Sequence, residues 1–229
     1  VHSCVDESNI GEIESIFNSK GKIYYKKEFF LSEKGYLNLK KISYQGAEWL
    51  GSAADGFAGA NDHAKKSNGT SPLRVYVLIS DCLSNILEIK AKVRDLVGLG
   101  NYSIHITDTH NEAINLSKYV LSSTSIKFIN RCPLDTSFDA TRNLVADYKS
   151  LIKREDRDLD DFCVVSSYSM GLYGIRMPRD LDYISIDPSF KISSKNIDRH
   201  DLDDNLYLLG ERRVILDPRM HFCFMNVKF

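Results

Sequence analysis

The chain has 229 residues, of which 43% are apolar and 27% charged, and its 30 lysines and arginines nearly balance 31 aspartates and glutamates, giving a formal net charge of -1. A chain of this length can bury a sizeable core, as one domain or as two small ones, without a disulfide or a metal. The isoelectric point of about 6.6 argues against a surface devoted to wrapping duplex nucleic acid, for which a value above about 9 is usual.

The chain carries no sign of a membrane span or a signal peptide. No apolar run approaches the roughly 18 residues of a membrane-spanning helix, and the N-terminal VHSCVDES has neither a basic start nor an apolar centre. We therefore expect an intracellular, cytoplasmic protein. The five cysteines are widely spaced and form no C-x-x-C pair, which favours reduced, structural thiols. The missing initiator Met and the strand-like end FCFMNVKF indicate a fragment of a longer protein.

Short apolar runs alternate with amphipathic helical patterns through most of the chain, which predicts an α/β (α+β) fold. In the first 130 residues, the predicted helices are 10–17, a glycine-interrupted 36–66, 86–97 ended by Gly98, and 110–121. The predicted strands there are 22–31, 74–79, 103–107 and 125–129.

The second half repeats this alternation with more strands. A helix is expected over 138–152, followed by strands over 162–167, 181–186, 212–218 and 221–229, with an acidic loop over 198–204. The charge-rich connection KREDRDLDD (153–161) is the expected boundary between two parts. Residues 1–155 would form an N-terminal α/β region of unknown role, and 156–229 a second mixed sheet with helices.

The strongest chemical signal is the pair Asp180 and Asp182, two positions apart at the start of a predicted strand. Because strand side chains alternate between faces, both carboxylates would point the same way, roughly 6–7 Å apart at the backbone. Such oxygen ligands suit Mg²⁺ or Mn²⁺, which retains waters and accepts substrate phosphates. Two such ions about 3.5–4 Å apart stabilise the attacking and leaving oxygens of a phosphoryl transfer.

The residues around this pair fit phosphate chemistry. Ser166 and Ser167 end a predicted strand before a helix-like turn, where hydroxyl and backbone N–H groups hold phosphate oxygens. Arg176 and Arg179 stand beside the pair and would neutralise charge that develops on a transferred group.

Together these residues resemble the nucleotidyltransferase fold of the DNA polymerase β superfamily. That family carries Gly-Ser at the end of a first strand, an Asp-hydrophobic-Asp on the second strand about a dozen residues later, and a third carboxylate on a later strand. Ser166-Ser167 and Asp180-Leu181-Asp182 take the first two places, and Asp217 in RRVILDP is the expected third carboxylate. The similarity extends over about residues 162–229.

The resemblance implies a role for each residue. Ser167 would contact nucleotide phosphates, Asp180 and Asp182 would bind metal, and Asp217 would position or activate the acceptor hydroxyl. The chain departs from the family pattern at Ser166, where the family has glycine, and in a long spacing between the serines and Asp180.

A second resemblance concerns the biological context. The phrases YGIRMPRDLDY and DPRMHFCFMNVKF are similar to nucleotidyltransferase-type domains in bacterial or viral proteins of surface-glycan assembly. This similarity implies a role with sugars or phosphosugars, in which the chain would work beside other domains of a longer protein.

Three functions remain open. The first is a Mg²⁺- or Mn²⁺-dependent transferase that passes a nucleotidyl or phospho-group from a nucleoside triphosphate to a small-molecule or glycan acceptor. The second is a glycosyltransferase that uses Asp180-Leu181-Asp182 as a DxD site for a sugar nucleotide, although a DxD at residue 180 of 229 is late for that fold. The third is a non-catalytic binding module of a larger glycan-assembly enzyme.

A second candidate ligand site lies at Thr107, Asp108 and Thr109, between a predicted strand and a predicted helix. Crevices at such junctions commonly bind ligands in α/β sheets. The simpler interpretation is a capping box, in which Thr109 and Glu112 close the helix N-terminus. Lesser candidates are a cation-attracting acidic loop near His200 and an aromatic platform. The platform residues are Tyr44, Trp49 and Phe57.

Overall fold

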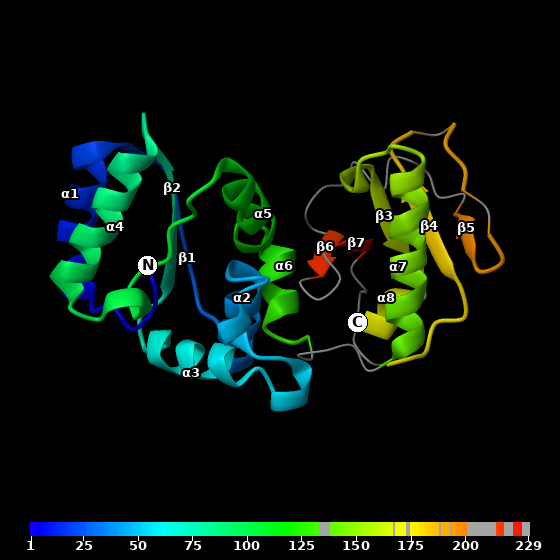
Figure 1. Ribbon diagram of the computed structural model, residues 1–229, viewed down its shortest axis with the longest axis horizontal. Coiled ribbons are helices and arrows are strands. Elements are labelled where there is room, and N and C mark those ends of the chain that lie inside the picture. Colours follow the sequence, from blue (N-terminus) through cyan, green and yellow to red (C-terminus); the bar gives the residue numbers. More distant parts are fainter. Residues whose placement is uncertain are drawn as a thin grey trace. The chain divides into compact units, whose positions relative to one another are not determined.

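The computed structural model describes residues 1–132, 138–166, 168–172, 175–187, 189–192 and 194–200, and the backbone of the strands at 214–217 and 222–225. Helices and strands are mixed, which confirms the predicted α/β (α+β) class (Figure 1). The chain divides into two compact units, Val1–Leu121 and Ser122–Phe229. Each unit has its own sheet.

The division falls earlier than the boundary that the sequence predicts near residue 155. Helix α7 (Asp139–Arg154) explains the difference, because its buried residues Tyr148 and Ile152 lie in one apolar cluster with Phe162 and Tyr183. The charge-rich stretch after α7 is therefore a connection inside the second unit, and the predicted boundary is corrected to the position between Leu121 and Ser122.

The first unit is a two-stranded sheet with helices on both sides (Figure 1). Its elements are η1 (Glu7–Asn9), α1 (Ile10–Lys20), β1 (Lys22–Phe29), α2 (Glu33–Ser43), η2 (Glu48–Leu50), η3 (Ala53–Asp55), α3 (Ala58–Ser67), β2 (Leu73–Ile79), α4 (Leu83–Val97), η4 (Gly100–Tyr102) and α5 (His110–Val120). Strands β1 and β2 pair antiparallel. Helices α1 and α4 lie together on one side, where Ile13, Phe17, Ile89 and Val93 form an apolar core.

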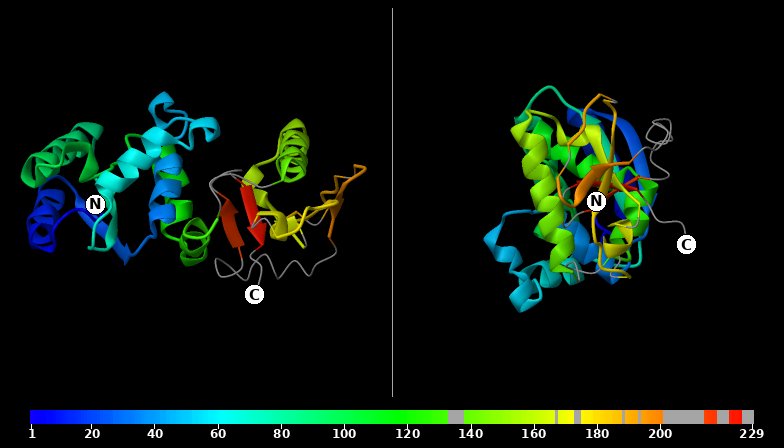
Figure 2. Two further views of the ribbon diagram at one scale, coloured as in Figure 1. Left: turned by 90° about the horizontal axis from the view of Figure 1, so that it is seen from below. Right: turned by 90° about the vertical axis from the view of Figure 1, so that its right-hand side faces the viewer.

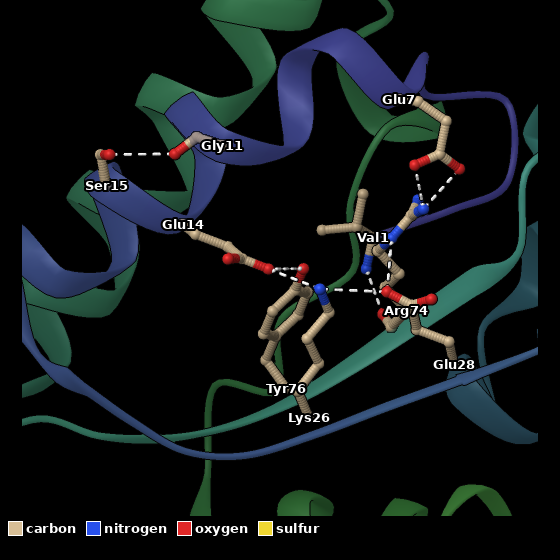
Figure 3. Close-up of polar contacts among 9 residues, drawn as sticks. All are labelled: Val1, Glu7, Gly11, Glu14, Ser15, Lys26, Glu28, Arg74 and Tyr76. Atoms are coloured by element: carbon tan, nitrogen blue, oxygen red, sulfur yellow. Dashed lines mark hydrogen bonds and ion pairs between the residues drawn. The ribbon is translucent and has the colours of Figure 1, made fainter.

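A polar network joins α1 and the residues before it to the sheet (Figure 3). The Arg74 guanidinium on β2 is 3% exposed and forms ion pairs with Glu7 and, at 3.0 Å, with Glu28. Lys26 lies 2.8 Å from the Glu14 carboxylate and 3.0 Å from that of Glu28. Because the Arg74 side chain is buried and its partners come from separate elements, the network fixes η1 and β1 against β2.

The second unit contains a mixed sheet of order β5-β4-β3-β7-β6. Its elements are α6 (Ser123–Ile129), α7 (Asp139–Arg154), η5 (Leu159–Asp161), β3 (Phe162–Val165), α8 (Tyr168–Leu172), β4 (Leu181–Ser185), β5 (Ile197–Arg199), β6 (Val214–Asp217) and β7 (Phe222–Met225). Strand β4 runs antiparallel to β3, whereas β5 runs parallel to β4. Helix α7 lies across one face of β3 and β4 (Figure 2).

Three local predictions are corrected. Residues 125–129 lie in helix α6 rather than in a strand, because Ser122 caps that helix by accepting a hydrogen bond from the Ser125 amide. Residues 103–107 form no strand, although the Ser103 carbonyl accepts a hydrogen bond from the His2 amide at 2.9 Å. The expected acidic loop begins inside a strand, since Asp198 belongs to β5; residues 201–204 lie outside the described part.

Candidate functional site

Strand register places two aspartates side by side at one end of the second sheet. Asp182 on β4 is opposite Val165 on β3, and on its other side it is in register with Asp198 on β5. Neighbouring strands lie roughly 4.8 Å apart. The sheet therefore brings Asp182 beside Asp198, which the sequence analysis expected in an acidic loop.

The two carboxylates lie on the sheet face opposite α7. Leu181, Tyr183 and Ile197 are buried in the α7 core. Because successive strand side chains alternate, Asp182 and Asp198 point to the opposite face. Asp182 is partly buried and Asp198 is exposed. The Asp198 Oδ1 accepts a hydrogen bond from the Arg199 amide at 2.9 Å.

Asp180 lies next to this pair but outside the strand. Strand β4 begins at Leu181, so alternation fixes the face of Asp182 and leaves that of Asp180 to the preceding bend. Asp180 is exposed. The sequence predicted that Asp180 and Asp182 share one face of a strand. Only Asp182 lies in the strand, so the strand fixes the direction of Asp182 alone.

Ser166 directly follows β3 at the same end of the sheet. Because Val165 is opposite Asp182, the residue after Val165 lies level with the start of β4. Ser166 is exposed and has a φ of 59°, in the left-handed region that glycine adopts most readily. Ser167 lies outside the described residues.

Arg176 and Arg179 lie in the connection between α8 and β4, and both are exposed. Within the described part of the chain, neither guanidinium takes part in an ion pair. Both remain available to an anion that approaches the start of β4.

Asp217 does not join this group. It pairs with Phe222 on β7, and the parallel pairing of Val164 with Phe224 puts Phe222 level with Phe162. Phe162 is in turn opposite Ser185, at the far end of β4 from Asp182. Asp217 is thus three residues farther along the sheet, about 10 Å, and three strands away. The role of third carboxylate that the resemblance gave to Asp217 is corrected on this ground.

No ready-made metal centre is present among the described residues, since no group of three or more histidine, cysteine, aspartate or glutamate side chains is arranged to hold an ion. The pair Asp182 and Asp198 supplies two carboxylates. That number is typical for Mg²⁺ that takes its remaining ligands from water and from substrate phosphates.

At the second candidate site, Thr107, Asp108 and Thr109, most of the polar groups already bond to neighbouring residues. Thr109 accepts a hydrogen bond from the Glu112 amide at 3.2 Å, and Glu112 accepts one from the Asp108 amide at 2.9 Å. Thr109 therefore caps α5 as predicted, whereas Glu112 bonds the amide one residue before the cap, so the reciprocal bond of a capping box is not formed. Asp108 also forms an ion pair with Lys90 at 3.2 Å. Thr107 is partly buried just before this cap.

The aromatic platform is present in part. The rings of Tyr44 and Trp49 lie 5.0 Å apart in an edge-to-face arrangement. Phe57 instead lies beneath the Lys41 ammonium, 3.7 Å from its ring centroid. Two histidines join the platform, which sequence reasoning missed because they come from separate segments. They are His63 and His105.

Across the described residues, none of the helices combines the length and the apolar character needed to cross a membrane. Comparisons with family models, with curated proteins and with solved structures find no significant match.

Proposed function

We propose that the second unit is a metal-dependent nucleotidyl- or phosphotransferase that acts on a small-molecule or glycan acceptor. The observation that carries this proposal is the register of Asp182 with Asp198, next to the turn at Ser166. Two carboxylates hold a divalent cation, and the cation in turn binds the phosphates of a nucleoside triphosphate.

The backbone at Ser166 supports the proposal. The family that the chain resembles has glycine at this place. Ser166 adopts a φ of 59°, in the left-handed region where glycine is less strained than residues with a Cβ. The turn therefore keeps a glycine-like backbone in spite of its side chain. Such strained turns persist only when the surrounding structure enforces them, and they cluster at functional sites.

Each residue has a separate task in this proposal. Asp182 and Asp198 would hold Mg²⁺ or Mn²⁺, with Asp180 at the edge of the same site. The metal supplies charge neutralisation for the phosphates when it is bound. Ser166 and Ser167 would bind the phosphate oxygens, and exposed Arg176 and Arg179 would contact the leaving pyrophosphate or the acceptor phosphate.

The glycosyltransferase alternative fits the architecture less well. A single-Rossmann glycosyltransferase needs most of the chain in one sheet, whereas this chain has separate sheets of two and five strands. A non-catalytic module remains the second candidate, because Ser166 departs from glycine and the described residues contain no cluster of three metal-ligating groups.

Ligand-dependent thermal stability tests the proposal. The full chain is heated with ATP, CTP or UDP-glucose, each with MgCl₂ or with EDTA. We expect a nucleoside triphosphate at 100 times its Kd to add about 2.7 kcal/mol to the free energy of unfolding, with Mg²⁺ only.

The double variant Asp182→Asn/Asp198→Asn should lose this stabilisation, while Asp147→Asn on the exposed face of α7 should retain it. Stabilisation that persists in the double variant contradicts the site. A preference for UDP-glucose supports glycosyl transfer instead, and the absence of any Mg²⁺-dependent effect supports a non-catalytic module.

A further inference from the structure

The first unit buries a lysine without a carboxylate. Lys40 on α2 is fully buried, with an exposure of 0%. Its Nζ lies 2.9 Å from Nε2 of His2, and no acidic side chain among residues 1–132, all of which the structure describes, forms an ion pair with it. Burial lowers the pKa of Lys40 to about 7. A buried ammonium without a counter-charge is costly, so an anion at this position would stabilise the charged form of Lys40.

His2 adds an unpaired ring nitrogen beside Lys40 rather than negative charge. His2 is 5% exposed, and its Nδ1 is buried without a hydrogen-bond partner. Most buried polar atoms in folded proteins are hydrogen-bonded, so the unpartnered Nδ1 of His2 beside the buried lysine points to a missing ligand.

A layer of rings lies over this lysine. The Tyr44 ring centroid is 5.9 Å from the Lys40 Nζ and 4.8 Å from the His105 ring. The His63 ring packs 5.3 Å from that of Trp49 and 4.9 Å from that of Tyr102. These five rings come from different segments of the first unit, and we call them the ring cluster. Trp49 is 45% exposed, so the cluster extends from the buried lysine to solvent.

We propose that Lys40, His2 and the ring cluster form a binding site for a phosphorylated ring compound, either a nucleotide or a sugar phosphate. The phosphate would accept hydrogen bonds from Lys40 and from His2. Lys40 would supply the positive charge, and among the described residues the hydrogen-bond partner of its Nζ is His2. The base or the sugar ring would stack on Tyr44 and Trp49, because flat aromatic faces bind such rings. This site lies in the first unit and does not depend on the function proposed for the second.

The ligand reaches Lys40 only when Tyr44 moves. Tyr44 ends α2, and residues 45–57 after it are mostly exposed. Gly46, Gly51 and Gly56 in that segment all have positive φ, and only Leu50 is buried there. This segment is therefore largely exposed, and a local opening that moves Tyr44 and Trp49 requires no disruption of the α1–α4 core. A histidine metal site is not the explanation, since the described residues form no group of three ligands.

Isothermal titration calorimetry tests the proposal on the full chain. The titrants are inorganic phosphate, AMP and glucose 1-phosphate, all in EDTA so that a metal-dependent site in the second unit stays silent. We expect AMP or glucose 1-phosphate to bind more tightly than inorganic phosphate. The better of the two identifies the ring as a base or as a sugar.

Two variants locate the site. Lys40→Met should weaken every titrant about tenfold or more, whereas Lys65→Met, an exposed lysine on α3, should leave binding unchanged. Trp49→Ala, which removes the 45% exposed ring of the cluster, should weaken binding of the ring compounds and leave binding of inorganic phosphate unchanged. Absence of binding overturns the proposal, and so does binding that survives Lys40→Met. If Lys40→Met does not fold, equal binding of AMP to the wild type and to Trp49→Ala overturns it.

Discussion

Asp182 and Asp198 are like charges on neighbouring parallel strands. Such a pair destabilises a sheet by roughly 0.2–1 kcal/mol unless donors or a cation compensate. Asp198 accepts one hydrogen bond, from the adjacent Arg199 amide. At the scale of single residues, we expect repulsion between these two side chains to lower the stability of the free protein, and a bound cation would relieve it.

This repulsion gives a test that separates Asp198 from Asp217. Asp198→Asn removes one charge of the pair, so we expect the metal-free protein to gain up to about 1 kcal/mol in the free energy of unfolding. The same variant should lose Mg²⁺-dependent binding of a nucleoside triphosphate. Urea unfolding and calorimetry measure the two effects.

Asp217→Asn is the matched substitution at the far end of the sheet. It should leave Mg²⁺-dependent binding at the wild-type level. If Asp217→Asn abolishes binding and Asp198→Asn does not, then the register argument fails and the carboxylate expected from the family resemblance is the functional one.

Helices α1 and α3 each have glycine as their second residue. The two helices show that packing against a neighbouring element decides whether a side chain fits at that position. Gly11 in α1 has open space where a Cβ would stand. A Cβ on Gly59 in α3 would lie 1.7 Å from the Trp49 carbonyl oxygen. The glycine of α3 is thus what lets η2 approach that helix and hold Trp49 in the ring cluster.

The two glycines predict opposite effects for one substitution. Gly59→Ala should lower the free energy of unfolding by roughly 1–3 kcal/mol, because the backbone of η2 must move away. Gly11→Ala should raise it by about 0.5–1 kcal/mol through helix propensity. The sole tryptophan of the chain, Trp49, reports both unfolding curves by fluorescence. A loss of stability in Gly11→Ala, or none in Gly59→Ala, would contradict this account of the contact.

At the scale of the whole molecule, sequence reasoning succeeded where a residue acts on its neighbours in the chain. Gly98 ends α4 with a φ of 72°, and Thr109 caps α5, both as predicted. The α/β alternation also follows from local periodicity. The 125–129 prediction failed because a short apolar run fits a strand as well as a helix, and the Ser122 cap decides between them.

Contacts between segments that are far apart in the sequence could not be predicted from local sequence patterns. The sequence shows Asp198 and Asp217 as two later aspartates, and only strand order and register reveal that one lies beside Asp182 and the other does not. Lys40 stands next to Lys41 in the sequence, and only the fold shows that it is buried against His2. Pairing and burial of this kind depend on how the whole unit packs.

The buried polar groups of the first unit make its stability depend on pH. Burial lowers the pKa of Lys40 to about 7, and it lowers the pKa of His63 and of His105 to about 4. His2 shifts in the same direction. The charged and titratable groups around them are Cys4, Tyr36, Tyr44, Asp62, Lys66, Arg74, Lys90, Arg94, Asp108 and the Val1 amine.

In each of the four side chains the folded state binds protons less readily than the unfolded state. Stability is therefore greatest above the unfolded pKa, near 10.5 for Lys40 and 6.5 for the histidines, and it falls as the pH drops toward the folded values. We expect Trp49 fluorescence in urea to give a free energy of unfolding about 2 kcal/mol or more lower at pH 5 than at pH 8.

Lys40→Met separates the two contributions to this pH profile. Above pH 7 the variant should lose the slope that Lys40 causes, and between pH 6.5 and pH 4 it should keep the slope of the histidines. A phosphorylated ligand that pairs with the Lys40 ammonium should flatten the upper part of the wild-type profile in the same way, because the bound anion restores the ordinary preference of that lysine for its charged form. A wild-type profile that is level from pH 9 to pH 5 would show that these groups are hydrated in solution, and the missing counter-charge at Lys40 would then need no ligand.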